Sequence, residues 1–396
     1  MTTTAIRSIH PFPARMAPEL ALQPLQALKA NSLVLDPMSG SGTVLRHALS
    51  LGHRAIGYDV DPLAVLMARV WTSPVDSAEV ERQLLSLQSE AAALDLRSSK
   101  LPWIESGSET QAFIEYWFAP EQRRALTRLA YILHRRRGEL QRGARGPELD
   151  VLQLALSRII VTKDAGASLA RDTSHSRPHK VGDSCDFDVA AGFERSVRQI
   201  LLRASENGVN SAAQIKLGDA RSLDLTSGSV DAVITSPPYL NAIDYLRGHR
   251  LALVWLGYTL DELRTIRSNS IGAERAPDVV RADLQSVMAG IVADQRFESR
   301  VEGMIRRYAG DLLSLTHQVA KVLRPGGSAT YVVGNSCLKG NFVNNAKGLS
   351  IAAQQFGMRL VSETIRELPA GSRYLPVTGN DLSKRMRTEV VLTFQR

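Results

Sequence analysis

Short apolar segments alternate with stretches of helical periodicity over most of the chain. A run of apolar residues between turn-forming residues predicts a buried strand, and apolar residues recurring every three or four positions predict an amphipathic helix. The segments that predict strands are residues 32–36, 53–59, 211–217, 229–234, 328–333, 359–368 and 388–394. The segments that predict helices beside them are residues 43–51, 241–256, 311–323 and 350–356. This alternation, with an antiparallel final pair, predicts an α/β fold with a doubly wound, Rossmann-like sheet.

The strand pattern stops between residues 77 and 210, over a distance much longer than an ordinary connection between sheet elements. Apolar residues in this region recur at helical spacing. The helical segments are residues 77–96, 120–133 and 149–160. We therefore expect three parts: residues 1–76 with an N-terminal arm and the first half of the sheet, a mostly helical insertion at 77–210, and the second half of the sheet at 211–396.

The composition adds a charge signal to this pattern. The chain has 396 residues, of which 44% are hydrophobic and 22% charged, as is ordinary for a globular protein. Its net charge of +8 favours a polyanionic partner. Two cysteines, Cys185 and Cys337, are too few for a disulfide framework and fit a reducing compartment. No apolar run approaches the length of a membrane span, so we expect a cytoplasmic protein without membrane contact.

The densest positive run lies inside the predicted insertion. Glycines in and after this run predict a mobile loop that is suited to nucleic-acid phosphates, although such a run is more often a solvated helix face. The arginines that would contact the phosphates are Arg135, Arg136, Arg137, Arg142 and Arg145. The two histidines of the polar segment 168–180 lack a cysteine or carboxylate partner at metal-ligand spacing, so we expect no metal site.

A loop of small residues follows the first predicted strand, which ends in Asp36. Gly40 and Gly42 allow a ligand to approach the backbone closely, and the start of the following helix offers free N–H groups. The loop lacks the Lys-Ser/Thr ending of a P-loop, which argues against a nucleoside triphosphate. The next strand ends in Asp59, about 20 residues beyond the glycines, at the spacing of a carboxylate that binds ribose hydroxyls. Asp219 ends a later strand and is suited to accept a hydrogen bond from an exocyclic amine.

The pentapeptide Thr-Ser-Pro-Pro-Tyr at 235–239 stands where the strand at 229–234 ends. Two prolines stop sheet pairing and force a rigid turn, and ligands bind at the carboxyl ends of strands in open α/β sheets. The Ser236 oxygen and the Pro237 carbonyl can accept hydrogen bonds from an NH2 group, while Tyr239 can stack on a planar ring. A plain turn after a core strand is the competing interpretation of this pentapeptide when it is taken alone.

The N-terminal segment 8–20 contains three prolines and reads as an extended arm before a helix that begins near Pro18. It carries His10, Phe12 and Arg15. Two roles remain open for these side chains: a strap packed on the protein, or direct contact with a ligand.

Taken together and in this order, the segments DPMSGSGTV (36–44), GYDVDP (57–62), GDAR (218–221) and TSPPY (235–239) resemble the amino-group DNA methyltransferases of the TSPPY type. These enzymes use S-adenosylmethionine to methylate cytosine N4 or adenine N6. The arm SIHPFPARMAPEL (8–20) is similar to the N-terminal cofactor motif of those members in which the cofactor motifs precede the catalytic one. The resemblance covers the predicted sheet, and it matches the insertion less clearly.

The resemblance implies roles for individual residues. The loop after Asp36 would hold the methionine part of the cofactor under the N-terminal arm, Asp59 the ribose and Asp219 the adenine amine. The implied cofactor-binding residues are His10, Phe12, Arg15, Asp36, Pro37, Gly40, Ser41, Gly42, Thr43, Asp59, Asp219 and Ala220. The implied catalytic residues, which would hold the target base, are Ser236, Pro237, Pro238 and Tyr239.

The resemblance also suggests the substrate. Serine before Pro-Pro-Tyr is typical of cytosine-N4 enzymes, so the first expectation is N4 methylation of a cytosine flipped out of double-stranded DNA. Adenine N6 is the next alternative, and the amine of an RNA base is a weaker one. A restriction–modification role fits this reading, and phage defence and gene regulation are the alternatives. The insertion would then either read the DNA or act as a lid. A catalytically silent DNA-binding protein is the rival from another class, and intact cofactor motifs argue against it.

Overall fold

The computed structural model describes residues 6–12, 16–97, 99–140, 146–173, 178–208, 211–240, 244–272, 283–292, 297–338, 341–367 and 388–396. The chain folds into two compact units. Unit 1 consists of Met1–Pro13, Asp61–Ala212 and Asp244–Thr265, and unit 2 consists of Ala14–Val60, Ala213–Ile243 and Ile266–Arg396. Unit 1 thus contains the whole of the predicted insertion at 77–210, together with an N-terminal segment, residues 61–76 and residues 244–265.

Unit 2 contains the predicted doubly wound sheet. Its seven strands are β1 (Leu33–Asp36), β2 (Arg54–Asp59), β5 (Gln214–Leu217), β6 (Val230–Thr235), β7 (Leu323–Gly334), β10 (Arg359–Glu367) and β11 (Thr388–Gln395). They are arranged in the order β10-β11-β7-β6-β1-β2-β5. Every pairing from β7 to β5 is parallel, and β11 runs antiparallel to both of its neighbours. The predicted α/β fold with an antiparallel end is therefore confirmed.

Helices cover both faces of this sheet. They are α1 (Pro18–Gln26), α2 (Thr43–Ser50), α12 (Leu284–Val292), α13 (Ser299–Val322) and α14 (Asn345–Gln355), and a small hairpin, β8 (Ser336–Leu338) with β9 (Asn341–Val343), precedes α14. Successive residues of β1 point to opposite faces. Val34 packs with the α1 and α2 side chains, whereas Leu35 belongs to the core that α12, α13 and α14 cover. Burial on both faces explains why β1, β2, β6 and β7 read as apolar runs, whereas the edge strands β5 and β10 are largely exposed.

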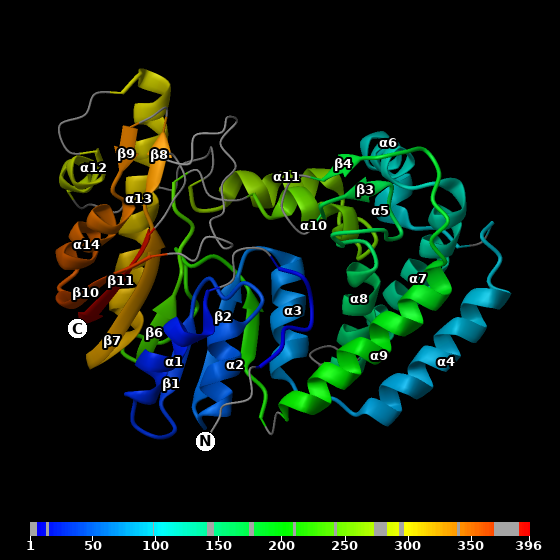
Figure 1. The fold of residues 1–396 in the computed structure, drawn as a ribbon, viewed down its shortest axis with the longest axis horizontal. Helices are drawn as coiled ribbons and strands as arrows, with labels where there is room; N and C mark the ends of the chain where they lie inside the picture. Colours follow the sequence, from blue (N-terminus) through cyan, green and yellow to red (C-terminus); the bar gives the residue numbers. More distant parts are fainter. Residues whose placement is uncertain are drawn as a thin grey trace. The chain divides into compact units, whose positions relative to one another are not determined.

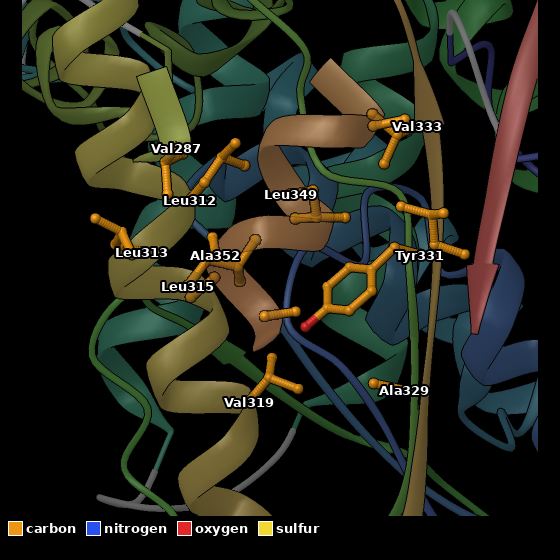
Figure 2. Close-up of a cluster of buried hydrophobic side chains, with 14 of the residues drawn as sticks. Val287, Leu312, Leu313, Leu315, Val319, Ala329, Tyr331, Val333, Leu349 and Ala352 are labelled. Carbon is orange, nitrogen blue, oxygen red and sulfur yellow. The ribbon is translucent and has the colours of Figure 1, made fainter. Parts of the chain in front are cut away.

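β7, α13 and α14 lie side by side (Figure 1), and all three contribute side chains to the larger core cluster. Figure 2 shows Leu312 and Val319 of α13, Leu349 of α14 and Tyr331 of β7 gathered in this cluster, and all four are fully buried. Burial of side chains of this size contributes roughly 1.5–3 kcal/mol each. The cluster therefore fixes α13 firmly against the sheet, beside the strand ends that carry the candidate site.

Unit 1 is mostly helical, as predicted for the insertion. Its helices are α3 (Pro62–Thr72), α4 (Ser77–Ala93), α5 (Pro102–Glu105), α6 (Ser108–Trp117), α7 (Pro120–Glu139), α8 (Pro147–Arg158), α9 (Val189–Asn207) and α10 (Leu246–Leu253). The hairpin β3 (Ala170–Arg171) with β4 (His179–Lys180) also belongs to it, and α11 (Leu260–Asn269) spans the boundary between the units.

Local sequence signals explain where the helices of unit 1 begin. Asp61 accepts a hydrogen bond from the Leu63 amide at 2.9 Å, and Pro62 occupies the first helical position of α3. Asp76 and Asp188 cap α4 and α9 in the same way. No helix among the residues that the structure describes has both the length and the apolar character needed to cross a membrane.

Several element bounds differ from the sequence expectation. β5 begins at Gln214 rather than at residue 211, because its pairing with β2 starts at Ile56 opposite Gln214. α13 begins at Ser299, well before residue 311, since Val301, Ile305 and Tyr308 extend its buried face. β7 begins at Leu323 rather than at residue 328, because it starts directly after α13 and pairs Leu323 with Val230 of β6.

Candidate active site

Four neighbouring parallel strands of unit 2 bring the predicted site residues to one edge of the sheet. Asp219 follows β5, Asp59 ends β2, Asp36 ends β1 and Ser236 follows β6, and these strands are adjacent in the order β5-β2-β1-β6. Neighbouring strands lie about 4.8 Å apart, so the row extends over roughly 14 Å. The chain reverses its direction of sheet growth between β1 and β6, which is the point where open α/β sheets bind ligands.

The loop between β1 and α2 has the backbone shape that its glycines predict. Gly40 and Gly42 adopt positive φ angles of 50° and 92°, a region that favours glycine. The Gly40 amide donates a 2.8 Å hydrogen bond to Asp59, so the loop and the second acid are directly connected. β2 approaches the loop so closely that a Cβ at Gly57 would lie 3.1 Å from the Ser39 hydroxyl oxygen and 2.4 Å from Leu45. Gly57 is thus a close-packing glycine of the site that the sequence analysis did not single out.

Two hydroxyl groups of this loop are buried without a hydrogen-bond partner among the described residues. They belong to Ser39 and Ser41, whose exposed fractions are 6% and 4%. Leaving a buried hydroxyl unpaired costs about 1–3 kcal/mol in proteins. Polar groups of a ligand bound on the loop, such as an amino group or a carboxylate, would satisfy them. The loop therefore fits the polar methionine end of S-adenosylmethionine, with Pro37 and Thr43 at its two ends.

Asp36 is buried at the centre of the row, with an exposed fraction of 3%. Burial raises the pKa of this carboxyl from 3.8 to about 7, although the Thr235 hydroxyl at 2.7 Å and the Met38 amide at 3.2 Å donate to it and oppose the shift. The side chain therefore changes charge near neutral pH. A cationic group bound beside it would favour the ionised form.

Ser236 is oriented by the backbone of β7. Its hydroxyl donates a 2.9 Å hydrogen bond to the Val332 carbonyl, which leaves the lone pairs of the oxygen to accept hydrogen bonds. The adjacent Pro237 is buried and has no N–H of its own. Burial raises the pKa of Tyr239 to about 12, so its ring is uncharged at neutral pH. Ser236 thus keeps lone pairs that can accept hydrogen bonds, and the roles predicted for Pro237 and Tyr239 toward a base remain predictions.

The turn is braced by residues that the sequence analysis did not identify. The Tyr308 hydroxyl of α13 donates to the Pro238 carbonyl at 3.2 Å, and Ser336 donates to the Leu240 carbonyl at 2.7 Å. Asn345 in turn donates to Ser336 at 2.8 Å. These contacts join positions far apart in the chain, and no local motif signals them.

At the far end of the row, Asp219 is held by its near neighbour Arg221. The guanidinium donates to both carboxylate oxygens, at distances between 2.6 and 3.1 Å. Ala220 between them is buried with an exposed fraction of 2%. The sequence motif GDAR contains this arginine, but no role was predicted for it.

The predicted contacts of the N-terminal arm with the cofactor remain predictions. His10 and Phe12 belong to unit 1, where the His10 ring is 2.9 Å from the Ser157 hydroxyl and Phe12 stacks on Tyr245 with 5.1 Å between ring centroids. Within unit 1 these side chains therefore act as a packed strap. Arg15 lies outside the described residues.

The prediction of a mobile loop at the arginine run is wrong for residues 135–137. They lie in the last turns of α7, where Arg135 and Arg136 pair with Glu90, and Arg137 pairs with Asp150. These pairs lie within unit 1 and occupy guanidinium groups that were expected to contact phosphates. Arg142 and Arg145 lie outside the described residues.

No protein-family model matches the chain. It is similar to the type II methyltransferase M.MvaI of Kocuria varians, with 20% identity over 371 residues that cover 83% of this chain and 77% of that protein. It is also similar to the type II methyltransferase M.MjaII of Methanocaldococcus jannaschii, with 29% identity over 86 residues, which are 22% of this chain and 16% of that protein.

Solved structures resemble the chain only weakly. An S-adenosylmethionine-dependent methyltransferase from Methanosarcina mazei gives a TM-score of 0.32 at 10% identity, covering 94% of this chain and 95% of that one. A TehB-like methyltransferase of the same class from Corynebacterium glutamicum gives 0.31 at 8% identity, covering 96% and 89%. TM-scores this low support no argument about function, and the fold is established by the topology of the sheet itself.

Proposed function

We propose that the protein is an S-adenosylmethionine-dependent DNA methyltransferase that transfers a methyl group to the exocyclic N4 amine of cytosine. The observation that carries this proposal is the row formed by Asp219, Asp59, Asp36 and Ser236 at the carboxyl ends of four adjacent strands. Its length of roughly 14 Å suits an extended cofactor with a target base at one end. The similarity to two type II methyltransferases supports the same activity.

Each part of the row has a distinct role in this proposal. Asp219 accepts a hydrogen bond from the adenine amine, and Asp59 accepts hydrogen bonds from the ribose hydroxyls. Asp36 pairs with the amino group of the methionine part, while the hydroxyls of Ser39 and Ser41 complete the polar surface there. When bound, the cofactor supplies an electrophilic methyl group on a positively charged sulfur.

The Thr-Ser-Pro-Pro-Tyr turn prepares the target amine. The lone pair of an exocyclic amine is delocalised into the ring, which makes the amine a poor nucleophile. Ser236 and the Pro237 carbonyl would accept hydrogen bonds from its two N–H groups and favour a more tetrahedral nitrogen, with the lone pair available to the methyl group. The new N–C bond would form as the S–C bond of the cofactor breaks, and the amine would then release one proton to solvent. This arrangement relies on positioning and needs no covalent intermediate. Stacking on Tyr239 offsets roughly 1–3 kcal/mol of the cost of removing the base from the duplex.

The choice of cytosine over adenine depends on Ser236, because serine at this place is typical of cytosine-N4 enzymes in the family that the motifs resemble. The net charge of +8 favours DNA or RNA over an uncharged substrate. Adenine N6 in DNA is the alternative product that the same geometry allows.

The test is incubation of duplex DNA with the protein and methyl-labelled S-adenosylmethionine, followed by nucleoside digestion and mass spectrometry. We expect labelled N4-methylcytosine from the wild type and a loss of at least about 100-fold in Ser236→Ala, if its hydrogen bond is made mainly in the transition state. Ser362→Ala, an exposed serine on β10, is the matched control and should retain full activity.

Other outcomes separate the alternatives. Labelled N6-methyladenine would agree with the proposed mechanism but show that the target base is adenine. Label in RNA but not in DNA would change the substrate class. A wild-type protein that binds no S-adenosylmethionine in calorimetry would refute the methyltransferase proposal as a whole.

A further inference from the structure

Arg221 lies almost fully buried between two carboxylates of unit 2. Only 10% of its side chain is exposed, and that of Asp311 on α13 is entirely buried. Arg221 Nη2 is 2.6 Å from Asp219 Oδ2, and Nη1 is 2.5 Å from Asp311 Oδ1. A buried charge is tolerated when it is paired and hydrogen-bonded, and this arginine satisfies both conditions.

The contacts use most of the donors of the guanidinium. Nε is 3.0 Å from Asp219 Oδ1, and Nη2 also donates to the Asn269 carbonyl. A lysine could not reproduce this fork, because its ammonium is a single point with three rotatable donors. The residue type at position 221 is therefore matched to bridging two carboxylates at fixed angles.

Arg221 leaves the Asp219 carboxylate with a defined free direction. Oδ1 accepts from the Arg221 backbone amide at 2.8 Å, Oδ2 accepts from Nη2 at 2.6 Å, and the Nε–H is shared between Oδ1 at 3.0 Å and Oδ2 at 3.1 Å. A carboxylate has about four acceptor sites. Three N–H groups of Arg221 thus share these sites, and the part of the carboxylate left for a ligand is the edge that faces solvent, since 31% of the Asp219 side chain is exposed.

Asp311 anchors this arrangement to the core. Its Oδ2 accepts from the Gly272 amide at 2.8 Å, and its neighbours on α13, Leu312 and Leu313, are fully buried in the cluster of Figure 2. Because α13 is held along its length by that cluster, Asp311 fixes Arg221 in place.

We propose that Arg221, held by Asp311, is a positioning residue that orients Asp219 so that one carboxylate oxygen selects the amino group of the cofactor's purine. This inference rests on the proposed function, since it assigns the specificity of the same cofactor site. Arg221 acts through Asp219 and does not itself touch the cofactor. Its effect should therefore depend on whether the purine carries an amino group.

The test compares two ligands in calorimetry: S-adenosylhomocysteine, which has the purine amine, and S-inosylhomocysteine, which has a carbonyl in its place. Wild type should prefer the adenosyl ligand by at least about tenfold, because the other would set a carbonyl oxygen against Asp219. Arg221→Lys should reduce the affinity for the adenosyl ligand by about tenfold and leave the affinity for the inosyl ligand nearly unchanged. Asp219→Ala should remove the same preference. The double variant, Arg221→Lys with Asp219→Ala, should lose no more affinity for the adenosyl ligand than Asp219→Ala alone.

Two further variants keep the test decisive. Asp311→Asn preserves the size of the side chain and should also reduce the preference for the adenosyl ligand over the inosyl ligand. It replaces Arg221→Lys if that variant does not fold. Arg324→Lys alters another arginine–aspartate pair of unit 2, with Asp231, and should change neither affinity. Equal weakening of both ligands by Arg221→Lys, or additive losses in the double variant, would overturn the inference. A wild type that binds neither ligand would instead refute the proposed function, and this inference with it.

Discussion

Asp36 shows how one buried side chain can make cofactor binding depend on pH. Its pKa is raised to about 7 by burial, so it is mostly protonated below that pH. If the ionised form binds the cofactor's amino group, affinity should fall roughly eightfold between pH 7.5 and 6, following the ionised fraction. Calorimetry at the two pH values measures this. Asp36→Asn should bind the cofactor weakly at both pH values. An equally steep fall of affinity with pH in that variant would contradict the pairing of Asp36 with the cofactor's amino group.

The same residue makes an opposite prediction for stability. A carboxyl whose pKa rises from 3.8 to about 7 on folding stabilises the fold below pH 3.8, and this contribution is lost as the pH rises to about 7. Asp36→Asn should therefore be more stable than wild type at pH 8, by up to about 4 kcal/mol, and no more stable at acidic pH. Urea unfolding of the cofactor-free protein at pH 4 and pH 8 tests it. Asparagine retains an oxygen for the Thr235 and Met38 donors, so a variant less stable than wild type at pH 8 would refute the argument.

At the scale of elements, α13 connects the core to the catalytic turn. Tyr308→Phe should remove its hydrogen bond to the Pro238 carbonyl, costing about 1 kcal/mol of stability and lowering kcat with little change in cofactor affinity. Tyr331→Phe on β7 is the matched control. Tyr331 is equally buried, but its hydroxyl has no partner among the described residues, so its removal should be neutral or stabilising. Equal effects of the two changes on kcat would show that the turn does not depend on Tyr308.

The elements also show which parts of the site the sequence can predict. Asp36, Asp59 and Ser236 were predictable because each stands at the end of an apolar strand, and parallel strands bring their carboxyl ends to one edge. Tyr308 and Ser336 were not, since their partners in the turn lie 70 and 96 positions away. The arginines at 135–137 were predicted as a loop for a related reason. Arg135 and Arg136 pair with Glu90 on α4 and Arg137 pairs with Asp150 on α8, and local composition carries no information about such pairings.

At the scale of the whole molecule, the two units can be followed separately. The four tryptophans, Trp71, Trp103, Trp117 and Trp255, all belong to unit 1. Tryptophan fluorescence therefore reports the unfolding of unit 1, whereas the sheet that carries the candidate site contributes to far-ultraviolet circular dichroism. If the units unfold independently, the two signals should separate when a ligand stabilises unit 2.

His10 in the N-terminal strap gives unit 1 a pH dependence that this fluorescence can measure. Burial lowers the pKa of His10 well below 6.5, so its contribution to stability is fully present above pH 6.5 and is lost as the pH falls below it. The urea midpoint of the tryptophan signal should fall between pH 8 and pH 5.5, and by less in His10→Gln. The comparison isolates His10, because Asp150, another buried group of unit 1 with a shifted pKa, titrates in both proteins. An identical fall in the two proteins would mean that His10 binds protons equally in the folded and unfolded chains and adds nothing to the pH dependence, and the strap would then owe its stability to the Ser157 contact and the stacking of Phe12 alone.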